Sequence, residues 1–527
     1  MNRFQLRGAL AALALSAVCG AFAAPFTSGN LVVLQVGADG GPTLTNAAQP
    51  VFLKEYTPGG VLVQTIVINA TGAGPKLTMS GTATAEGALS IGELSIGTKG
   101  LMFGGYNAVA GSVGGAGVGG QGTGTSVANS DPAVIARTVG LVDDSGTVDL
   151  TTLLGDAYHS NSIRSAVIHT DLRTYTGGTS SGASNGGTAG VRIANIGWTT
   201  STQLSSMLTN TRVVVVYNNQ LYVSSQSGTF VGISTVGTGT PATSGQTITL
   251  LPGMTNDVVN GNNQSPYGFV FADESTLYVA DDRTITNGGG IVKYTKDGGG
   301  NWSVAYRLQV GLTGTGARSV CIAGQDGSGN KILSIVTGHN GESAAASNQV
   351  MTVTDTGPLA AFSSVVTSPT NTKFRGVVCY VSGAEKTISG TINLASYVGN
   401  PSARAITFEV VDGSNTTVQT ETLNLDGSNG YSFSTSVADG SYDVFVKGTT
   451  WLRKKVASVN VTSTGATVST TLDYNGDLDN NNVIDSDDFD ILVADFGGNG
   501  PGDVDGSGTT DSDDFDILVA NFGLGGD

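Results

Sequence analysis

The sequence has few of the groups that catalysis and nucleic-acid binding commonly need. Its three histidines, His159, His169 and His339, are scattered without metal-ligand spacing or a nucleophile motif. No basic patch stands out among the 24 Lys and Arg, which argues against a nucleic-acid partner. No apolar run after the N-terminus approaches ~20 residues, so we expect no transmembrane anchor. Few long helix formers accompany the 78 Gly, which favours short strands and tight turns.

The N-terminus has the layout of a secretory signal. Arg3 and Arg7 precede an apolar stretch at 9–18, and residues 21–23 (Ala-Phe-Ala) fit a small-x-small cleavage pattern. The residues before Cys19 lack the usual lipoprotein pattern, so we expect ordinary cleavage near Ala23. The sequence therefore predicts a signal peptide at 1–23 and a secreted or cell-surface protein.

Two of the three cysteines remain after that cleavage, Cys321 and Cys379. Both lie in apolar, strand-like runs. They could pair in an oxidising compartment, or remain as buried thiols.

Residues 24–384 alternate β-rich runs with Gly, Ser, Asn and Asp turns, which indicates a sandwich, barrel or propeller. Residues 267–282 form a strand-turn-strand pattern that is echoed at 213–224 and, more loosely, at 101–106. A unit of four strands over roughly 40 to 50 residues is typical of a propeller, and this segment would hold about six to eight blades. The segment resembles the β-propeller domains of secreted bacterial proteins, without a WD or kelch signature. Expected strands include 30–36, 51–56, 61–68, 89–103, 163–174, 213–223, 269–280, 291–294, 303–310, 319–323, 332–337 and 374–381.

Residues 385–472 are expected to form a small β-sandwich. Seven strands are predicted, at 387–394, 405–411, 417–425, 431–437, 442–447, 452–461 and 467–472. The aromatic pattern at 430–433 and 440–446 resembles the carboxypeptidase-regulatory-like and starch-binding-like modules of bacterial exoproteins. Trp451 is either a sugar-stacking surface or a core residue, and the core role is the more frequent one for such a residue.

The negative charge is concentrated in residues 473–527, which contain fifteen Asp and no Lys, Arg or Glu. This segment contributes −15 of the formal net charge of −17, so the remainder carries −17 − (−15) = −2. Such a run is usually a solvated tail unless it has a pattern. Here it does: Asp-Ser-Asp-Asp-Phe-Asp-Ile-Leu-Val-Ala occurs at 485–494 and again at 511–520.

Each copy ends a loop with oxygen donors at the spacing of an EF-type calcium loop. Calcium takes roughly six to eight oxygen ligands, supplied by loop positions 1, 3, 5, 7, 9 and 12. Position 7 contributes its backbone carbonyl. In the first loop the predicted ligands are Asp477, Asp479, Asn481, Val483, Asp485 and Asp488. In the second they are Asp503, Asp505, Ser507, Thr509, Asp511 and Asp514. Asn482 stands at position 6 of the first loop, where the chain needs a left-handed turn that Asn tolerates.

An apolar stripe at helical spacing follows each loop: Phe489, Leu492, Val493 and Phe496, then Phe515, Leu518, Val519 and Phe522. Two such loop-helix units can bury their stripes against each other. With Asp at position 12, the segment at 473–527 resembles a type I dockerin. That resemblance implies two Ca²⁺ ions and a cohesin-like or other surface partner. It also implies partner contacts through positions 10 and 11, which are Ser486-Asp487 and Ser512-Asp513 here, and the identical pairs would permit two symmetric orientations.

An active site is less well indicated. A hydrolase needs two carboxylates across a cleft, and the candidates Asp273, Glu274, Asp281 and Asp282 sit at predicted turns or strand ends. Trp198 and Trp302 could line a sugar groove, but we expect both to pack in the core.

Three functions remain open. The propeller is a recognition scaffold delivered by the calcium module, a glycoside hydrolase or polysaccharide lyase, or part of a structural cell-surface protein. We expect the first, with a role in polysaccharide catabolism and a possible polysaccharide ligand.

Overall fold

The computed structural model describes residues 24–95, 98–113, 126–169, 172–181, 183–338, 347–381, 386–435, 437, 440–462 and 465–527. The predicted signal peptide, Cys19 and His339 lie outside these residues. The described chain is mainly β-structured and divides into two compact units. The first runs to Tyr380; the second contains residues 92–99 and 169–172 together with Val381–Asp527. No described helix is both long and apolar enough to cross a membrane.

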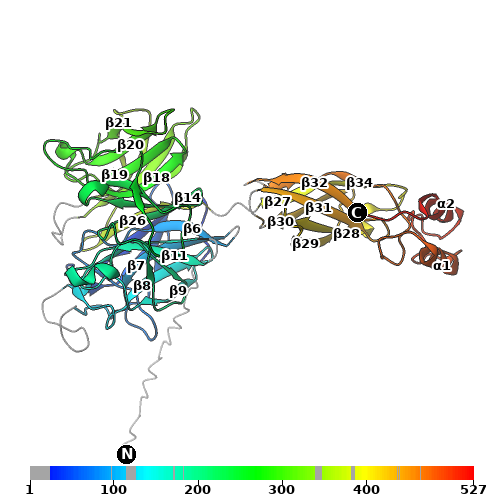
Figure 1. Ribbon diagram of the computed structural model, residues 1–527, viewed down its shortest axis with the longest axis horizontal. Helices are drawn as coiled ribbons and strands as arrows, with labels where there is room; N and C mark the ends of the chain where they lie inside the picture. Colours follow the sequence, from blue (N-terminus) through cyan, green and yellow to red (C-terminus); the bar gives the residue numbers. More distant parts are fainter. Residues whose placement is uncertain are drawn as a thin grey trace, which may run out of the picture. The chain divides into compact units, whose positions relative to one another are not determined.

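The described residues of the first unit form six four-stranded sheets, the blades of a β-propeller (Figure 1). All but one sheet take their strands consecutively from the chain, as blades do. In sheet order they are β26 (Lys373–Cys379), β1 (Leu31–Val36), β3 (Val51–Tyr56), β4 (Leu62–Val67); β6 (Ser90–Ser95), β7 (Thr98–Tyr106), β8 (Arg137–Asp143), β9 (Val148–Leu154); β10 (Ile163–Ile168), β11 (Arg173–Gly178), β12 (Arg192–Asn195), β13 (Thr202–Gln203); β14 (Val214–Tyr217), β15 (Gln220–Ser225), β16 (Gly232–Val236), β17 (Ile248–Leu250); β18 (Pro266–Asp273), β19 (Thr276–Asp281), β20 (Gly290–Lys296), β21 (Trp302–Leu308); and β22 (Ala317–Gln325), β23 (Lys331–Thr337), β24 (Gln349–Thr354), β25 (Ser363–Thr367).

Smaller elements complete this unit and the next. A two-stranded sheet pairs β2 (Ala48–Gln49) with β5 (Met79–Ser80). Short 3₁₀ helices are η1 (Val127–Asn129), η2 (Ala183–Thr188), η3 (Gly228–Phe230), η4 (Ile285–Asn287) and, in the second unit, η5 (Pro401–Ala403).

The first blade is closed by the last strand of the unit. β26 pairs antiparallel with β1, so that Leu31 lies opposite Cys379. Cys379 is also disulfide-bonded to Cys321 of β22, with the two Cα atoms 5.6 Å apart. Of the two states that the sequence left open for these cysteines, the disulfide is the one formed. It links the last blade to the strand that closes the first.

The internal echoes correspond to equivalent strands of different blades. Residues 277–280 belong to β19, 221–224 to β15 and 101–104 to β7, and each is the second strand of its sheet. The turn before β15 is made by Asn218 and Asn219, with φ of 46° and 55°. Because Asn tolerates this left-handed conformation, two residues suffice to reverse the chain. The sequence similarity therefore reflects the repeating blade.

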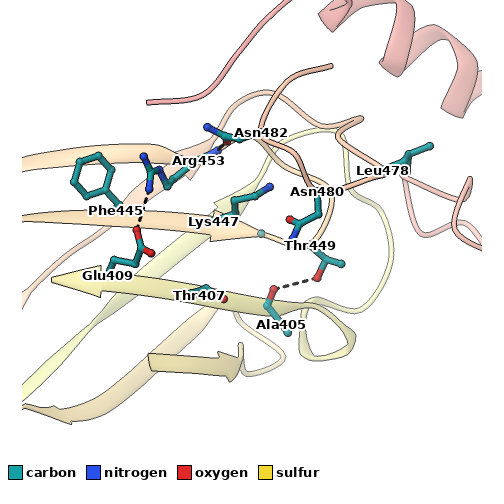
Figure 2. A pocket seen from close by; sticks show the side chains of 11 residues that line it. Ala405, Thr407, Glu409, Phe445, Lys447, Thr449, Arg453, Leu478, Asn480 and Asn482 are labelled. Carbon is teal, nitrogen blue, oxygen red and sulfur yellow. Dashed lines mark hydrogen bonds and ion pairs between the residues drawn. The ribbon is translucent and has the colours of Figure 1, made fainter. Parts of the chain in front are cut away.

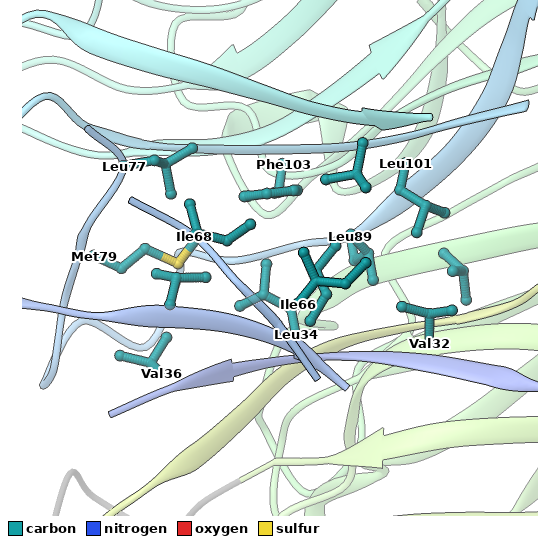
Figure 3. Close-up of a cluster of buried hydrophobic side chains, with 14 of the residues drawn as sticks. Val32, Leu34, Val36, Ile66, Ile68, Leu77, Met79, Leu89, Leu101 and Phe103 are labelled. Atoms are coloured by element: carbon teal, nitrogen blue, oxygen red, sulfur yellow. The ribbon is translucent and has the colours of Figure 1, made fainter. Parts of the chain in front are cut away.

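Adjacent blades pack through apolar side chains. One cluster contains Val32, Leu34 and Val36 of β1 with Leu101 and Phe103 of β7, all at most 1% exposed. Figure 3 shows these side chains facing one another between the strands. Full burial of one such side chain stabilises the fold by roughly 1.5–3 kcal/mol. The alternating apolar pattern thus fixes which face of each blade meets its neighbour.

The second unit begins with a β-sandwich of two sheets, β30-β27-β33 with β34 also paired to β27, and β29-β28-β31-β32. Figure 1 shows its strands in yellow and orange, followed by the two helices in red. The strands are β27 (Lys386–Leu394), β28 (Ala405–Val411), β29 (Thr417–Asn424), β30 (Gly430–Thr435), β31 (Gly440–Gly448), β32 (Lys454–Val461), β33 (Gly465–Thr467) and β34 (Thr470–Leu472). The helices are α1 (Ser486–Asp495) and α2 (Ser512–Asn521).

The strand predicted at 467–472 is wrong as a single element. It is divided into β33 and β34, both parallel to β27. Between them the Val468 carbonyl accepts a hydrogen bond from the Tyr431 hydroxyl, at 2.8 Å. The same carbonyl oxygen would lie 2.0 Å from a Cβ added at Gly390, so only glycine fits there. A side-chain bond to the backbone thus interrupts the ladder.

The three tryptophans differ in environment. Trp451 is fully buried in the sandwich core, and its indole N–H donates to the Ala395 carbonyl at 3.1 Å, so it offers no stacking surface. Trp302 is 4% exposed and meets Phe271 edge-on. Trp198 is 51% exposed, so the expectation that it packs in the core is wrong.

Candidate metal centre

The two acidic loops each bring three carboxylates together. One oxygen from each of Asp477, Asp479 and Asp488 lies within 4.8 Å of the others. In the second loop Asp503, Asp505 and Asp514 do the same. These are positions 1, 3 and 12 of each predicted loop; the first two precede α1 or α2, and the third lies in the first turn of the helix.

The last carboxylate of each loop is held by backbone N–H groups. Asp488 accepts from Leu478 at 2.6 Å and Asp479 at 3.0 Å through one oxygen, and from Asp485 at 2.8 Å through the other. Asp485 is the N-cap of α1 and forms a capping box with Asp488. A negative residue in the first turn of a helix is favoured by the helix dipole. The motif therefore folds the loop back onto the helix start.

The second loop repeats this arrangement. Asp514 accepts from the Asp505 and Asp511 backbone N–H groups, at 3.0 and 2.9 Å. Asp511 is the N-cap of α2, again with a capping box. The duplicated sequence thus gives duplicated local geometry.

One oxygen in each loop has no partner. Within the described residues, Oδ1 of Asp477 and Oδ1 of Asp503 are buried and accept no hydrogen bond. A buried polar atom without a partner costs roughly 1–3 kcal/mol, and more when it is charged. Both atoms belong to position 1 of a three-carboxylate group. The residues present therefore fit a hard divalent cation, which prefers oxygen ligands.

Electrostatics favour the same conclusion in the second loop. Burial raises the pKa of the Asp514 carboxyl, and the negative charges of Asp505 and Asp503 raise it further, against the opposing effect of its backbone hydrogen bonds. Like charges in a buried site repel, so a bound cation would offset both effects.

The remaining predicted ligands border these groups without joining the three-carboxylate cluster. Asn481 accepts from the Val483 N–H at 2.8 Å, and the Ser507 hydroxyl donates to the Thr509 carbonyl at 3.3 Å. The side chains of Asp485 and Asp511 cap the helices. Position 6 has the expected left-handed backbone in both loops, with φ of 72° at Asn482 and 98° at Gly508.

The sandwich contributes two cations that sequence reasoning missed. Lys447 of β31 is ion-paired with the Asp477 carboxylate at 2.6 Å, and it also donates to the Trp451 carbonyl at 2.9 Å. Arg404 donates to the backbone carbonyl of Asp503 at 2.9 Å. Neither residue carries a sequence signal, because each lies in or beside a strand far from the loop it contacts.

A polar pocket of about 540 Å³ lies where the first loop meets the sandwich. Figure 2 shows Asn480 and Asn482 of the loop on one side and Thr407 and Glu409 of β28 on the other. Arg453 contacts both sides. Its guanidinium donates to the Glu409 carboxylate at 3.0 Å, and its backbone N–H donates to the side-chain oxygen of Asn482 at 2.7 Å. The loop and the sandwich are thus joined by directed contacts.

The helix stripes are only partly buried, which corrects the expectation that they cover each other. Leu492 and Leu518 are fully buried together with Ile484 and with Leu452 of the sandwich. Phe489 and Phe515 meet edge-on, with ring centroids 5.9 Å apart. About half of each remaining stripe side chain is exposed: Val493, Phe496, Val519 and Phe522. Ser486, Asp487, Ser512 and Asp513 are also exposed.

Three of the candidate acids of the propeller form hydrogen bonds or ion pairs within the fold. Asp273 accepts from Ser275 in the exposed turn after β18, and Glu274 is exposed beside it. Asp281 is fully buried and pairs with Arg283 at 2.9 Å. Asp282 pairs with Arg318 at 3.2 Å.

The described histidines show no shared site. His159 lies 3.7 Å from Asp131, and His169 follows β10. They therefore remain scattered, as in the sequence.

No protein-family model matches the chain, and no curated protein matches it either. Among solved structures, a type II cohesin–X-dockerin complex from Acetivibrio cellulolyticus is 21% identical over 27% of this chain and 97% of that one, with a TM-score of 0.23. TolB from Acinetobacter baumannii is 11% identical, covers 66% of this chain and 67% of its own, and has a TM-score of 0.33. A GH32 β-fructofuranosidase from Bombyx mori is 10% identical over 74% of this chain and 88% of its own, with a TM-score of 0.28.

Proposed function

We propose that the protein is a secreted calcium-binding interaction protein. Its dockerin-like residues 473–527 bind two Ca²⁺ ions and dock a β-propeller recognition domain, residues 24–384, into an extracellular or surface assembly. Residues 385–472 join the two parts. The link to polysaccharide catabolism rests on the resemblance of the calcium module to type I dockerins.

The observation that carries this proposal is the repeated buried carboxylate oxygen without a partner. Asp477 and Asp503 each have one such oxygen, and each belongs to a three-carboxylate group. Calcium would supply the missing partner, and all predicted ligands are oxygen donors. In the first loop these would be Asp477, Asp479, Asn481, Val483, Asp485 and Asp488; in the second, Asp503, Asp505, Ser507, Thr509, Asp511 and Asp514.

Export is supported by the disulfide between Cys321 and Cys379. Disulfides persist in oxidising compartments and are rare in the reducing cytosol. The predicted signal peptide at 1–23 agrees with such a location.

Calcium titration of the purified full chain tests the metal proposal. We expect two ions per chain, and at least about 100-fold weaker binding after Asp477→Asn with Asp503→Asn, because ligand charge sets the affinity of such loops. The matched control is Asp490→Asn with Asp516→Asn, which alters exposed aspartates on the same helices and leaves binding unchanged. Equal affinity in both double variants would contradict the proposal.

Docking is proposed to occur on the exposed surface of α1 and α2. Half-exposed apolar side chains such as Phe496 and Phe522 cap the C-terminal ends of the two helices, and the exposed Ser-Asp pairs at 486–487 and 512–513 lie in their first turns. Large exposed aromatic side chains are frequent anchors of protein interfaces. Each copy presents the same elements, which would allow two orientations of one partner.

Binding of a purified type I cohesin module, with and without chelator, tests the docking proposal. We expect calcium-dependent binding that persists when Ser486 and Asp487 are changed to Ala, because the second copy remains. Changing Ser512 and Asp513 as well should weaken binding at least about tenfold. Absence of binding by the calcium-loaded protein would reject the cohesin-like partner and leave the metal sites unaffected.

A further inference from the structure

An arginine lies at the start of the innermost strand in four of the six propeller blades. Arg164 is the second residue of β10, Arg212 precedes β14, Arg318 is the second residue of β22, and Arg375 is the third residue of β26. In the blade of β18 the corresponding residue is Tyr267. Innermost strands of a propeller run side by side around its axis. The arginines therefore gather at one end of the axial channel.

Hydrogen bonds between neighbouring blades hold these strand starts level with one another. The Ser165 hydroxyl, next to Arg164, donates to the Arg212 carbonyl at 2.8 Å. On the other side, the Ala88 N–H donates to the Arg164 carbonyl at 3.2 Å. At Gly268 an added Cβ would come within 2.9 Å of the Arg318 carbonyl, so that pair of strands also packs closely.

Two of the guanidinium groups flank one aromatic ring. The Arg212 Cζ lies 4.0 Å from the Tyr267 ring centroid, and the Arg318 Cζ lies 5.3 Å from it. Burial lowers the pKa of Arg164, and the positive charge of Arg212 lowers it further, while Tyr267 acts in the opposite direction. Arg164 belongs to the same end of the channel through its place at the start of β10, next to the Ser165–Arg212 hydrogen bond.

The arginines outnumber the carboxylates that act on them. Arg318 pairs with Asp282 at 3.2 Å, and the negative charge of the buried Glu86 acts on Arg164. Arg164 donates instead to Asn210 at 2.6 Å, and Arg212 to the Ser265 hydroxyl at 2.9 Å and to Gln226. Within the described residues, the buried Nε of Arg164 has no partner. Arg164 and Arg212 are thus oriented by neutral hydrogen-bond partners, and the group retains the capacity to bind an anion.

The channel beyond the arginines is apolar. A cavity of about 320 Å³ is lined by the innermost strands of all six blades and reaches from Arg318 to Ile322. Four residue steps along a strand span about 13 Å. The wall of this cavity contains Val215, Val270, Ile322 and Ile91, and none of the residues that line the cavity is a carboxylate.

We propose that this channel binds an organic anion with an apolar body, such as an alkyl or aryl carboxylate. The carboxylate sits at Arg318, which lines the cavity, and at Arg212, which shares the Tyr267 ring with it, and the apolar body lies along the valine and isoleucine wall. A saccharide fits poorly, because its hydroxyl groups would face apolar side chains and lose hydrogen bonds. This inference concerns the propeller unit and does not depend on the calcium loops.

Isothermal titration of the full chain with octanoate tests the proposal, with acetate and 1-octanol as head-only and tail-only comparators. Octanoate is expected to bind once per chain and at least about tenfold more tightly than either comparator, since the charged head and the apolar body both contribute. Titrations in calcium and in chelator should agree, which separates this result from the behaviour of the C-terminal loops.

Two variants locate the binding. Arg212→Gln removes the charge, and Val215→Thr keeps the volume of the wall while adding a hydroxyl; each should weaken octanoate binding about tenfold. The matched control is Arg173→Gln, at the start of β11 and outside the channel lining, which should leave the affinity unchanged. Circular dichroism confirms that each variant is folded. Absence of octanoate binding, or binding that neither channel variant weakens, would overturn the proposal.

Discussion

The propeller and the C-terminal unit differ in the hydrogen bonds that their buried carboxylates accept. In the propeller, Asp355 is buried and accepts hydrogen bonds from Tyr278 at 2.5 Å, Tyr306 at 2.7 Å and Lys293 at 2.8 Å. In the C-terminal unit, Asp477 and Asp503 each keep one buried oxygen without a partner. A carboxylate satisfied within the protein supports the fold, whereas one left unsatisfied awaits a ligand. The difference separates structural acids from candidate metal ligands.

Removal of calcium should produce the largest difference between the two units. At free calcium about 100-fold above the dissociation constant, each site stabilises by about 2.7 kcal/mol, or about 5 kcal/mol for two sites. Chelation should therefore lower the unfolding temperature of the C-terminal unit and leave that of the propeller unchanged. Calorimetry of the full chain measures both transitions. An equal decrease in the unfolding temperature of the propeller with chelator would contradict a calcium effect confined to the C-terminal unit.

Lys447→Met should have the next largest effect, and only in the C-terminal unit. Breaking a buried ion pair costs roughly 3–5 kcal/mol, because the partner charge remains buried. The loss should be greatest without calcium and smaller with it, since the ion would then balance Asp477. Denaturant unfolding in chelator and in calcium measures this.

The control for that variant is Lys454→Met. Lys454 pairs with Asp473 at 2.5 Å, but both side chains are more than a third exposed. Such pairs contribute about 0–1 kcal/mol. Equal losses for the two lysine variants would show that Lys447 has no special role beside the loop.

Removal of the disulfide should affect the stability of the propeller and leave the C-terminal unit unchanged. Cys321→Ser with Cys379→Ser should destabilise the propeller by about 2–4 kcal/mol, because the bond constrains the unfolded chain. The C-terminal transition and calcium binding should remain as in the parent protein. A change confined to the C-terminal unit would contradict the assignment of this bond to propeller closure.

The smallest expected effect is the pH dependence of Asp355. Burial acts to raise the pKa of this carboxyl, but hydrogen bonds from Lys293, Tyr278 and Tyr306 outweigh it, so the pKa lies below the ordinary value of 3.8. Its stabilising contribution is therefore present at neutral pH and is lost as the pH falls below 3.8 towards the lowered pKa. Asp355→Asn should flatten the acid limb of propeller stability, measured by unfolding from pH 6 to pH 3. An unchanged acid limb would show that Asp355 does not contribute to it.

Local patterns predicted much of the architecture. Strand 405–411 was predicted with the bounds of β28, and 51–56 with those of β3. Runs 89–103 and 163–174 were each taken as one segment, but each contains the end of one strand and the beginning of the next. Hydrophobic alternation marks strands well but does not mark a short turn within an apolar run.

The local geometry of the two acidic loops was predictable because its signal is local. Ligand spacing, the helix cap and the left-handed position 6 all lie within a few residues of one another, and each is repeated. The exposed half of the helix stripes was not predicted, because helical periodicity identifies an apolar face without showing what covers it.

The sequence by itself determined the mainly β character, the blade-like repeat and the two acidic loops, because each depends on residues near one another in the chain. Only the tertiary structure decided that Cys321 pairs with Cys379, that Lys447 reaches Asp477, and that Arg212 and Arg318 flank Tyr267. These contacts join residues from different strands or blades. Their partners are chosen by how the sheets pack, and no local spacing in the chain encodes that choice.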